Sequence, residues 1–119
     1  MSEFPAEWVE AARVSKAWPF EEARKLVAEE IRKARAAGGR VLKVIHGYGS
    51  SGKGGTLCTG LRKSFGLRKK EDVIRDFVSG EDFSIFDERT LKLLEAVPGL
   101  RGDPDLNATN EGVTVVWLK

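Results

Sequence analysis

The chain has few of the residues from which covalent and metal cross-links are built. Its 119 residues include one cysteine and one histidine, His46. This scarcity excludes an intrachain disulfide and any metal site assembled from several cysteines. The formal net charge is only +2. Composition alone therefore does not indicate a nucleic-acid-binding protein, and a basic surface has to come from local clustering of charge.

Long apolar runs are also absent. No stretch approaches the roughly 20 apolar residues that cross a membrane, and the first residues, MSEFPAEWVE, lack the basic and then apolar pattern of a signal peptide. Hydrophobic residues nevertheless make up 41% of the chain and charged residues 32%, as is typical of a globular protein with a real core. We therefore expect one cytoplasmic domain spanning residues 1–119, with no membrane association.

Apolar spacing predicts most of the helices and strands. Phe20, Ala23, Val27 and Ile31 recur at three- and four-residue steps and predict a helix over residues 19–37, which the glycine pair after it ends. The other predicted elements are a strand over 41–46, a helix over 56–65 ended by Gly66, a strand over 73–78, a helix introduced by the capping-type segment 84–87 and carrying Leu91, Leu94 and Val97 on one side, and a strand over 113–118.

The N-terminal residues are less regular. Trp8, Val9 and Ala12 could lie on a short helix, and residues 13–17 could form a weak first strand. This order predicts an α/β fold, a two-layer sandwich with a mixed four-stranded sheet of βαβαββ type, helices on one face, and an extra helix inserted before the last strand. Residues 1–12 would then be an N-terminal extension and residues 79–111 an insertion.

The most informative stretch is VLKVIHGYGSSGKGG, residues 41–55. A β-branched strand ends in His46 and is followed by glycines at 47, 49, 52, 54 and 55, and a helix follows these. A strand, a glycine-rich segment and a helix N-terminus together present backbone N–H groups to an anion. So many glycines exceed what a turn needs, which favours close approach of the backbone to a ligand.

One interpretation of this segment is nucleotide binding. Residues 47–54 match the GxxxxGK spacing of a P-loop between a strand and a helix. However, Gly54 follows Lys53 where a hydroxyl is needed to hold Mg²⁺. A P-loop-type nucleotide binder is therefore the weakest of the candidate functions.

The other interpretation is contact with nucleic-acid phosphates. The densest basic run, in residues 62–70, follows the helix that starts at the glycines, and Lys16 and Lys43 could extend the same strip. Tyr48 could stack on an unpaired base. The candidate phosphate-binding residues are Gly47, Tyr48, Gly49, Ser50, Ser51, Gly52, Lys53, Lys16, Arg62 and Lys63.

His46 has two interpretations. A histidine at a strand end can fix the following backbone through a hydrogen bond, or it can act as a phosphate contact or general base. No carboxylate or second histidine is placed beside it by local sequence, and we predict no metal site. We expect no cofactor, with Mg²⁺ or Mn²⁺ required only if the protein is a nuclease.

Three pieces of the sequence resemble the Smr (small MutS-related) domain. They are the Glu-Glu-Ala segment at 21–23, the strand and His-Gly-x-Gly segment at 45–49, and the final GVTVVWL strand at 112–118. The resemblance covers nearly the whole chain. It implies a compact α/β sandwich, like the C-terminal domain of a bacterial translation initiation factor, that binds RNA or branched or nicked DNA; some members nick DNA or cleave RNA.

The chain also departs from that family. The family's first strand commonly carries an Asp-x-His motif followed by glycine, and the aligned positions here are Val14, Lys16 and Ala17. The resemblance therefore supports nucleic-acid binding further than cleavage. Two other functions stay open, a metal-dependent endonuclease with His46 as base and a protein-interaction module that uses segment 79–111.

Overall fold

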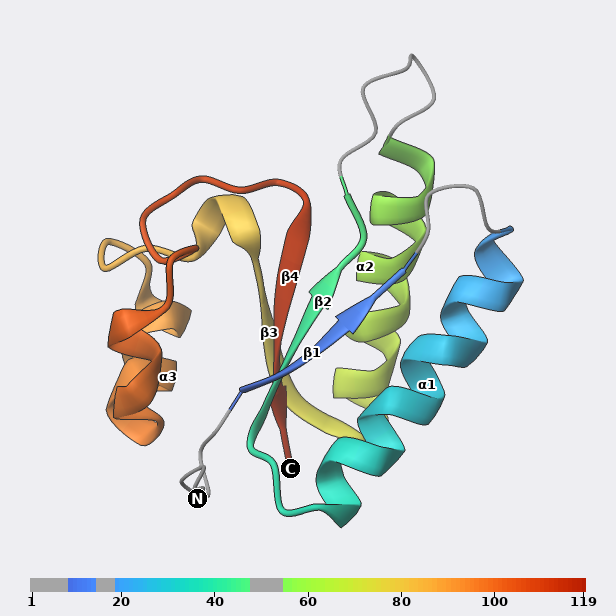
Figure 1. Ribbon diagram of the computed structural model, residues 1–119, viewed down its shortest axis with the longest axis horizontal. Coiled ribbons are helices and arrows are strands. Elements are labelled where there is room, and N and C mark those ends of the chain that lie inside the picture. Colours follow the sequence, from blue (N-terminus) through green and yellow to red (C-terminus); the bar gives the residue numbers. More distant parts are fainter. Residues whose placement is uncertain (1–8, 15–18, 48–54) are drawn as a thin grey trace.

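The computed structural model describes residues 9–14, 19–47 and 55–119. A four-stranded sheet forms its centre, in the order β1-β2-β4-β3 (Figure 1). The strands are β1 (Val9–Arg13), β2 (Val41–Ile45), β3 (Ile74–Ser79) and β4 (Val113–Leu118). β1 runs parallel to β2, whereas β4 is antiparallel to both β2 and β3. The mixed four-stranded α/β sheet predicted from the sequence is confirmed.

The first strand lies earlier than expected. β1 pairs in register with β2, from Val9 opposite Val41 to Arg13 opposite Ile45. The prediction of a short helix that includes Val9 and Ala12 is therefore wrong, because residues 9–12 belong to the sheet rather than to an extension. Of the strand predicted over 13–17, Arg13 is the last residue of β1, and residues 15–17 lie outside the described residues. Ala12 is buried in the core.

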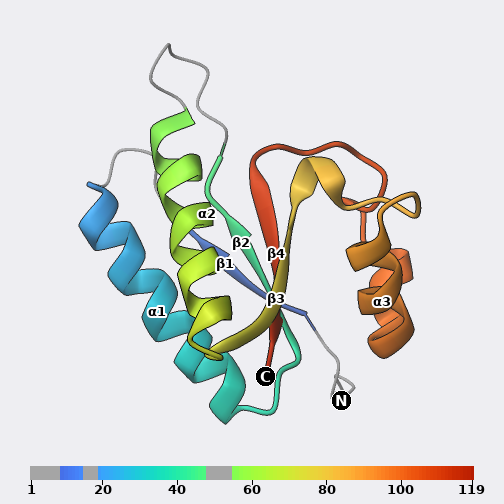
Figure 2. The same cartoon turned by 180° about the vertical axis from the view of Figure 1, so that it is seen from behind.

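Two helices cover one face of the sheet (Figure 2). They are α1 (Phe20–Ala36) and α2 (Gly55–Lys70). The spacing predicted for α1 is confirmed, since Ala23, Val27, Ile31 and Ala34 are the buried residues of that helix. These side chains pack with Leu42 and Val44 of β2, Leu61 and Phe65 of α2, and Ile74, Val116 and Leu118 in the first of two hydrophobic cores.

Helix α2 is longer than predicted. It passes through Gly66 and ends at Lys70, because one interior glycine costs only about 1 kcal/mol and the packing of α2 on the sheet outweighs that cost. The helix terminates where Asp72 takes a positive φ of 65°. The Asp72 N–H donates to Lys69 O at 3.1 Å, and the Val73 N–H to Arg68 O at 2.8 Å, which is the pattern of a Schellman motif.

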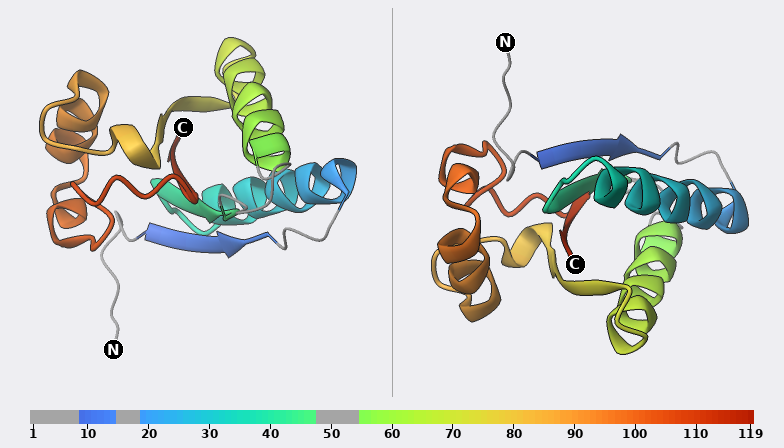
Figure 3. Two further views of the ribbon diagram at one scale, coloured as in Figure 1. Left: turned by 90° about the horizontal axis from the view of Figure 1, so that it is seen from above. Right: turned by 90° about the horizontal axis from the view of Figure 1, so that it is seen from below.

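The segment between β3 and β4 covers the opposite face of the sheet (Figure 3). It contains η1 (Gly80–Asp82), α3 (Glu88–Ala96) and η2 (Pro98–Gly102). Asp87 caps α3 by accepting from the Thr90 N–H, so the predicted capping segment and the extra helix are both confirmed. The sequence had not indicated which face α3 covers. The second hydrophobic core contains Val41, Val78, Phe83, Leu93, Leu94, Val97, Leu100 and Val115, whereas Leu91 is 45% exposed and was wrongly placed on the packing side.

Gly80 fixes the place where this segment leaves the sheet. A Cβ atom at this position would lie 1.9 Å from the backbone oxygen of Asn110 and 2.8 Å from that of Val113. Only glycine lets the two ends of segment 79–111 approach so closely. The segment therefore returns to the sheet beside its own starting point, and both ends meet next to the end of β2.

Candidate nucleic-acid interface

His46 lies buried at the end of β2, and both of its ring nitrogens are hydrogen-bonded. Nδ1 is 2.9 Å from Gly47 O and Nε2 is 2.9 Å from Thr114 Oγ1. Arg62 Nε donates to the same Thr114 oxygen at 3.1 Å. Because a carbonyl can only accept, Nδ1 carries the proton and donates to Gly47 O. In the neutral ring Nε2 is then an acceptor, so the Thr114 hydroxyl donates to Nε2 while its oxygen accepts from Arg62. The neutral imidazole satisfies every group in this chain of bonds.

Arg62 joins this chain to the segment that begins after β3. Its two terminal nitrogens donate to the two carboxylate oxygens of Glu81, at 2.8 and 2.9 Å. One of them also donates to Val113 O at 3.1 Å. Bidentate arginine–carboxylate pairs of this geometry are directional as well as strong. A single guanidinium therefore holds together α2, η1, β4 and, through Thr114, the end of β2.

The surroundings keep His46 neutral. Burial lowers the pKa of the imidazole from its ordinary value near 6.5, and the positive charge of Arg62 lowers it too, against the opposing effects of the Gly47 hydrogen bond and the Glu81 charge. His46 is 1% exposed, so neither nitrogen is open to solvent in this conformation. This arrangement matches the structural interpretation of His46, and a general base would need an accessible nitrogen.

The backbone at the start of the glycine-rich segment is fixed by β4. The N–H groups of His46 and Gly47 both donate to Gly112 O, at 3.0 and 2.9 Å. Gly47 adopts a positive φ of 71°, which favours glycine. After residues 48–54 the chain enters α2 at Gly55. The two ends of the segment are thus a strand end held by hydrogen bonds and a helix N-terminus.

All of the charged residues in helix α2 are basic. Its 16 residues include no aspartate or glutamate, and its basic residues are Arg62, Lys63, Arg68, Lys69 and Lys70. The partial positive charge of its N-terminus is therefore not offset by an acidic side chain of its own first turn. Lys63 is exposed and forms no ion pair with a residue in the described part of the chain, whereas Lys69 pairs with Asp76 at 3.2 Å.

The structure places only some of the predicted phosphate-binding residues. Gly47 lies at the strand end, Lys63 is on the surface of α2, and Arg62 is committed to Glu81 and Thr114. The phosphate contact predicted for Arg62 stays a prediction, and the structure gives this residue a positioning role. The predictions for Lys16, Tyr48, Gly49, Ser50, Ser51, Gly52 and Lys53 fall outside the described residues.

Lys43 does not join a basic strip. It is 9% exposed, and its ammonium donates to Asp103 at 2.8 Å and to Asp105 at 2.7 Å. Although burial alone would lower the pKa of Lys43, the hydrogen bonds and charges of the two aspartates raise it. The suggestion that Lys43 contacts phosphate is therefore wrong, because this side chain anchors the 103–105 turn to the centre of the sheet.

Sequence analysis missed the partners of His46 and Lys43. Thr114 was visible as a polar residue among β-branched ones in GVTVVWL, and a buried hydroxyl in a strand needs a partner. Glu81, Asp103 and Asp105 carried no comparable local signal.

Among the residues that the structure describes, no group of three or more histidine, cysteine or acidic side chains could hold a metal ion, and no helix is long and apolar enough to cross a membrane.

Comparison with known proteins identifies the fold. No family model and no curated protein matches the chain. Among solved structures, the chain is similar to the crystal structure of the Smr domain of Thermus thermophilus MutS2, with a TM-score of 0.58 and 20% identical residues. The similarity covers 92% of this chain and 98% of that one. The resemblance to the Smr domain that the motifs indicated is thereby confirmed at the level of the fold.

Proposed function

We propose that the chain is a nucleic-acid-binding domain that contacts phosphates through residues 46–55 and nearby basic residues. The observation that carries this proposal is the geometry of the two ends of that segment. Hydrogen bonds to Gly112 hold its start, and its end is the N-terminus of a 16-residue helix without acidic residues. Backbone N–H groups and a helix N-terminus favour a phosphate over a neutral ligand. The fold shared with an Smr domain is consistent with this assignment.

Binding rather than cleavage is the activity that the geometry supports. Both nitrogens of His46 are engaged and the side chain is enclosed, so the proposal contains no proton transfer by this residue. An endonuclease that used His46 as base would have to open the bonds to Thr114 and Gly47. Incubation of labelled RNA and nicked circular DNA with Mg²⁺ or Mn²⁺ tests that alternative, and cleavage undiminished by His46→Ala would exclude this mechanism.

Replacement of Lys53 tests the binding proposal directly. Affinity for RNA and for single-stranded, duplex and branched DNA should fall steeply with salt, because binding releases counterions. Lys53→Ala should reduce the slope of log affinity against log salt by about 1. The matched control is Lys92→Ala on α3, an equal loss of charge on the other face of the sheet, which should leave the slope unchanged. Gel shifts at two salt concentrations measure both. Binding that is independent of salt, or absent at micromolar protein, would contradict the proposal.

A protein partner at segment 79–111 is the second candidate function. Phe86 is 90% exposed, and Ile85 beside it is 43% exposed, which is unusual for large apolar side chains that are neighbours in sequence. Deleting the segment cannot test this candidate, because Phe83, Leu93 and Leu94 belong to the second core.

A photo-crosslinker at position 86 is the sharper experiment for a protein partner. It should capture a protein in cell extract that the same group at position 92 of α3 does not capture. With the crosslinker moved to the neighbouring position 85, Phe86→Ser should abolish the capture without changing the free energy of unfolding, since the aromatic ring is almost fully solvated in the folded chain. Equal labelling from both positions would reject this candidate.

A further inference from the structure

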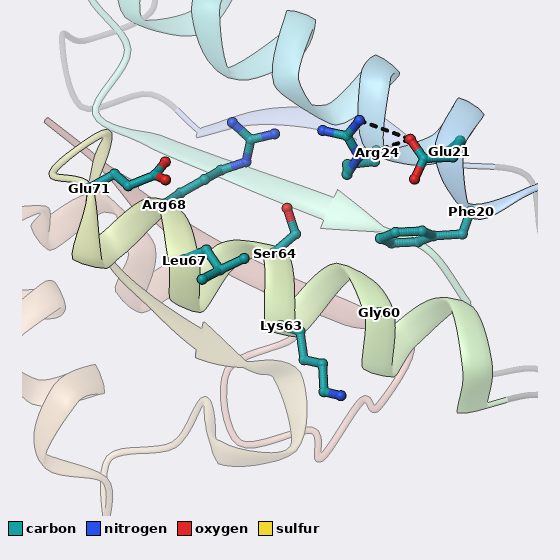
Figure 4. A pocket seen from close by; sticks show the side chains of 9 residues that line it. All are labelled: Phe20, Glu21, Arg24, Gly60, Lys63, Ser64, Leu67, Arg68 and Glu71. Carbon is teal, nitrogen blue, oxygen red and sulfur yellow. Dashed lines mark hydrogen bonds and ion pairs between the residues drawn. The ribbon is translucent and has the colours of Figure 1, made fainter.

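A groove of about 550 Å³ lies between α1 and α2, on the side of the helices away from the sheet (Figure 4). Its lining combines cationic, hydroxyl and apolar side chains from both helices with two carboxylates, Glu21 and Glu71. These include Phe20, Glu21 and Arg24 of α1 and Lys63, Ser64 and Arg68 of α2. Among the residues that the structure describes, none of the His46 network lines the groove.

Two guanidinium groups face this groove without a carboxylate bridging them. Arg24 donates to Glu21 of its own helix at 2.8 Å, an exposed pair on the rim of the kind that contributes little stability. Arg68 Nε is buried and has no hydrogen-bond partner among the residues that the structure describes. Burial lowers the pKa of Arg68 and the nearby charge of Arg24 lowers it further, against the opposing charge of Glu71. The folded chain thus holds like charges together beside an unsatisfied donor.

An anion between the two helices would offset the repulsion between the two guanidiniums. Figure 4 shows the Arg24 and Arg68 guanidiniums at the space between α1 and α2, with the Ser64 hydroxyl pointing into that space. Forked guanidinium donors fit the oxygens of a phosphate. The ring of Phe20 and the side chain of Leu67, which is 60% exposed, supply apolar surface that could contact a sugar or base.

We infer that the α1–α2 groove is a second phosphate site, which binds a backbone phosphate of the nucleic acid whose other contact is the glycine-rich segment. This inference rests on the proposed function. Arg68 lies 13 residues after the start of α2, about 20 Å along the helix axis at ~1.5 Å per residue. A stacked strand carries a phosphate every ~3.4 Å. The two sites are therefore about six phosphates apart along a stacked strand. Only an oligonucleotide long enough to cover that separation can contact both sites at once.

The test combines a groove variant with oligonucleotides of two lengths. Arg24→Gln with Arg68→Gln should weaken binding of a strand of about 12 nucleotides by about tenfold and lower its salt slope by about 1–2. A strand of about two nucleotides carries too few phosphates to span both sites, and its affinity should change less than twofold. The matched control is Arg32→Gln with Lys33→Gln, which also removes two positive charges from α1, each paired with an acidic residue three positions earlier.

Two further measurements locate the site and exclude a structural role. Amide NMR signals of residues 20–24 and 64–71 should shift when inorganic phosphate is added to the wild type and should not shift in the groove variant. The variant should unfold at an unchanged or higher urea concentration, because two repelling charges are removed. If Arg24 and Arg68 instead stabilised the fold, the variant would unfold at a lower urea concentration than the wild type.

The outcomes separate this inference from the proposed function. If the groove variant binds the longer strand as tightly as the control does, the groove is not a phosphate site and the proposed function stands. If the wild type binds no oligonucleotide, both fail together.

Discussion

Replacing Lys43 with methionine should lower the free energy of unfolding by about 3 kcal/mol, a large share of the stability of a domain of this size. Methionine keeps the length and most of the apolar stem of the side chain. It removes the charge that Asp103 and Asp105 share, and these carboxylates are only 11% and 18% exposed. Urea unfolding monitored by tryptophan fluorescence measures the change.

Two controls make the Lys43 experiment specific. Lys33→Met removes an exposed lysine that lies 3.8 Å from Glu30, and it should cost less than about 0.5 kcal/mol. The triple change Lys43→Met, Asp103→Asn and Asp105→Asn should recover much of the loss, since no buried charge is then left unpaired. A loss in the triple variant equal to that in Lys43→Met would show that methionine packing, and not unpaired charge, is responsible.

The Lys43→Met variant should also respond to acid in the opposite sense to the wild type. In the wild type, burial would raise the pKa of Asp105, but the hydrogen bonds from Lys43 and Asn110 lower it. That pair contributes stability above the unfolded pKa of the aspartate, which is lost as the pH falls through the folded value. Without Lys43, the effect of burial, which raises the pKa of Asp105, is opposed only by the Asn110 hydrogen bond, so protonation should reduce the deficit of the variant as the pH is lowered.

Replacing His46 with leucine should lower the free energy of unfolding by about 2–3 kcal/mol, because the buried acceptor of the Thr114 hydroxyl hydrogen is removed. Leucine fills a similar volume, so the effect of a cavity is kept small. His46→Gln is the comparison variant, since its amide can accept from Thr114 Oγ1 and should restore part of the loss. Equal losses in both variants would contradict a role for the hydrogen bonds.

The pH dependence of stability provides a second measurement at His46. A lowered pKa in the folded state means that the neutral form is favoured by folding. The resulting stability is fully present above the unfolded pKa near 6.5 and is lost as the pH falls toward the folded value. The wild type should lose at most about 1.4 kcal/mol per pH unit below about pH 6.5. His46 is the only histidine of the chain, so His46→Leu should remove this slope. An unchanged slope in that variant would assign the titration to another group.

Local sequence predicted the elements whose residues contact near neighbours in sequence. The spacing of Ala23, Val27 and Ile31 predicted α1, and VLKVI predicted β2. It could not predict which face α3 covers, because this depends on how the sheet presents Val41 and Val115 to Phe83 and Leu93. The position of β1 was missed for a similar reason, since its alternation is weak and its pairing with β2 determines it.

In the candidate site, too, the features set by neighbouring residues were predicted, and those set by distant residues were not. The glycine-rich segment and its anion-binding character follow from contiguous residues. The partners that fix its start do not, since Thr114 lies 68 residues after His46, and Glu81 lies 19 residues after Arg62. Lys43 was misassigned because lysine is rarely buried unless paired, and its partners are 60 and 62 residues away. Side-chain pairing over such separations is set by tertiary packing, which no local pattern reports.

The sheet order has a consequence for when the domain can form. β4 lies between β2 and β3, although residues 113–118 follow both of them in the chain. During synthesis, β2 and β3 therefore emerge from the ribosome before β4, the strand that pairs with both of them. Until β4 is made, the two cores on either side of the sheet cannot close. Contacts across so many residues make folding slow relative to helical domains. The His46 network, which needs Thr114, is completed only in that last step, so the start of the glycine-rich segment becomes ordered with the final strand.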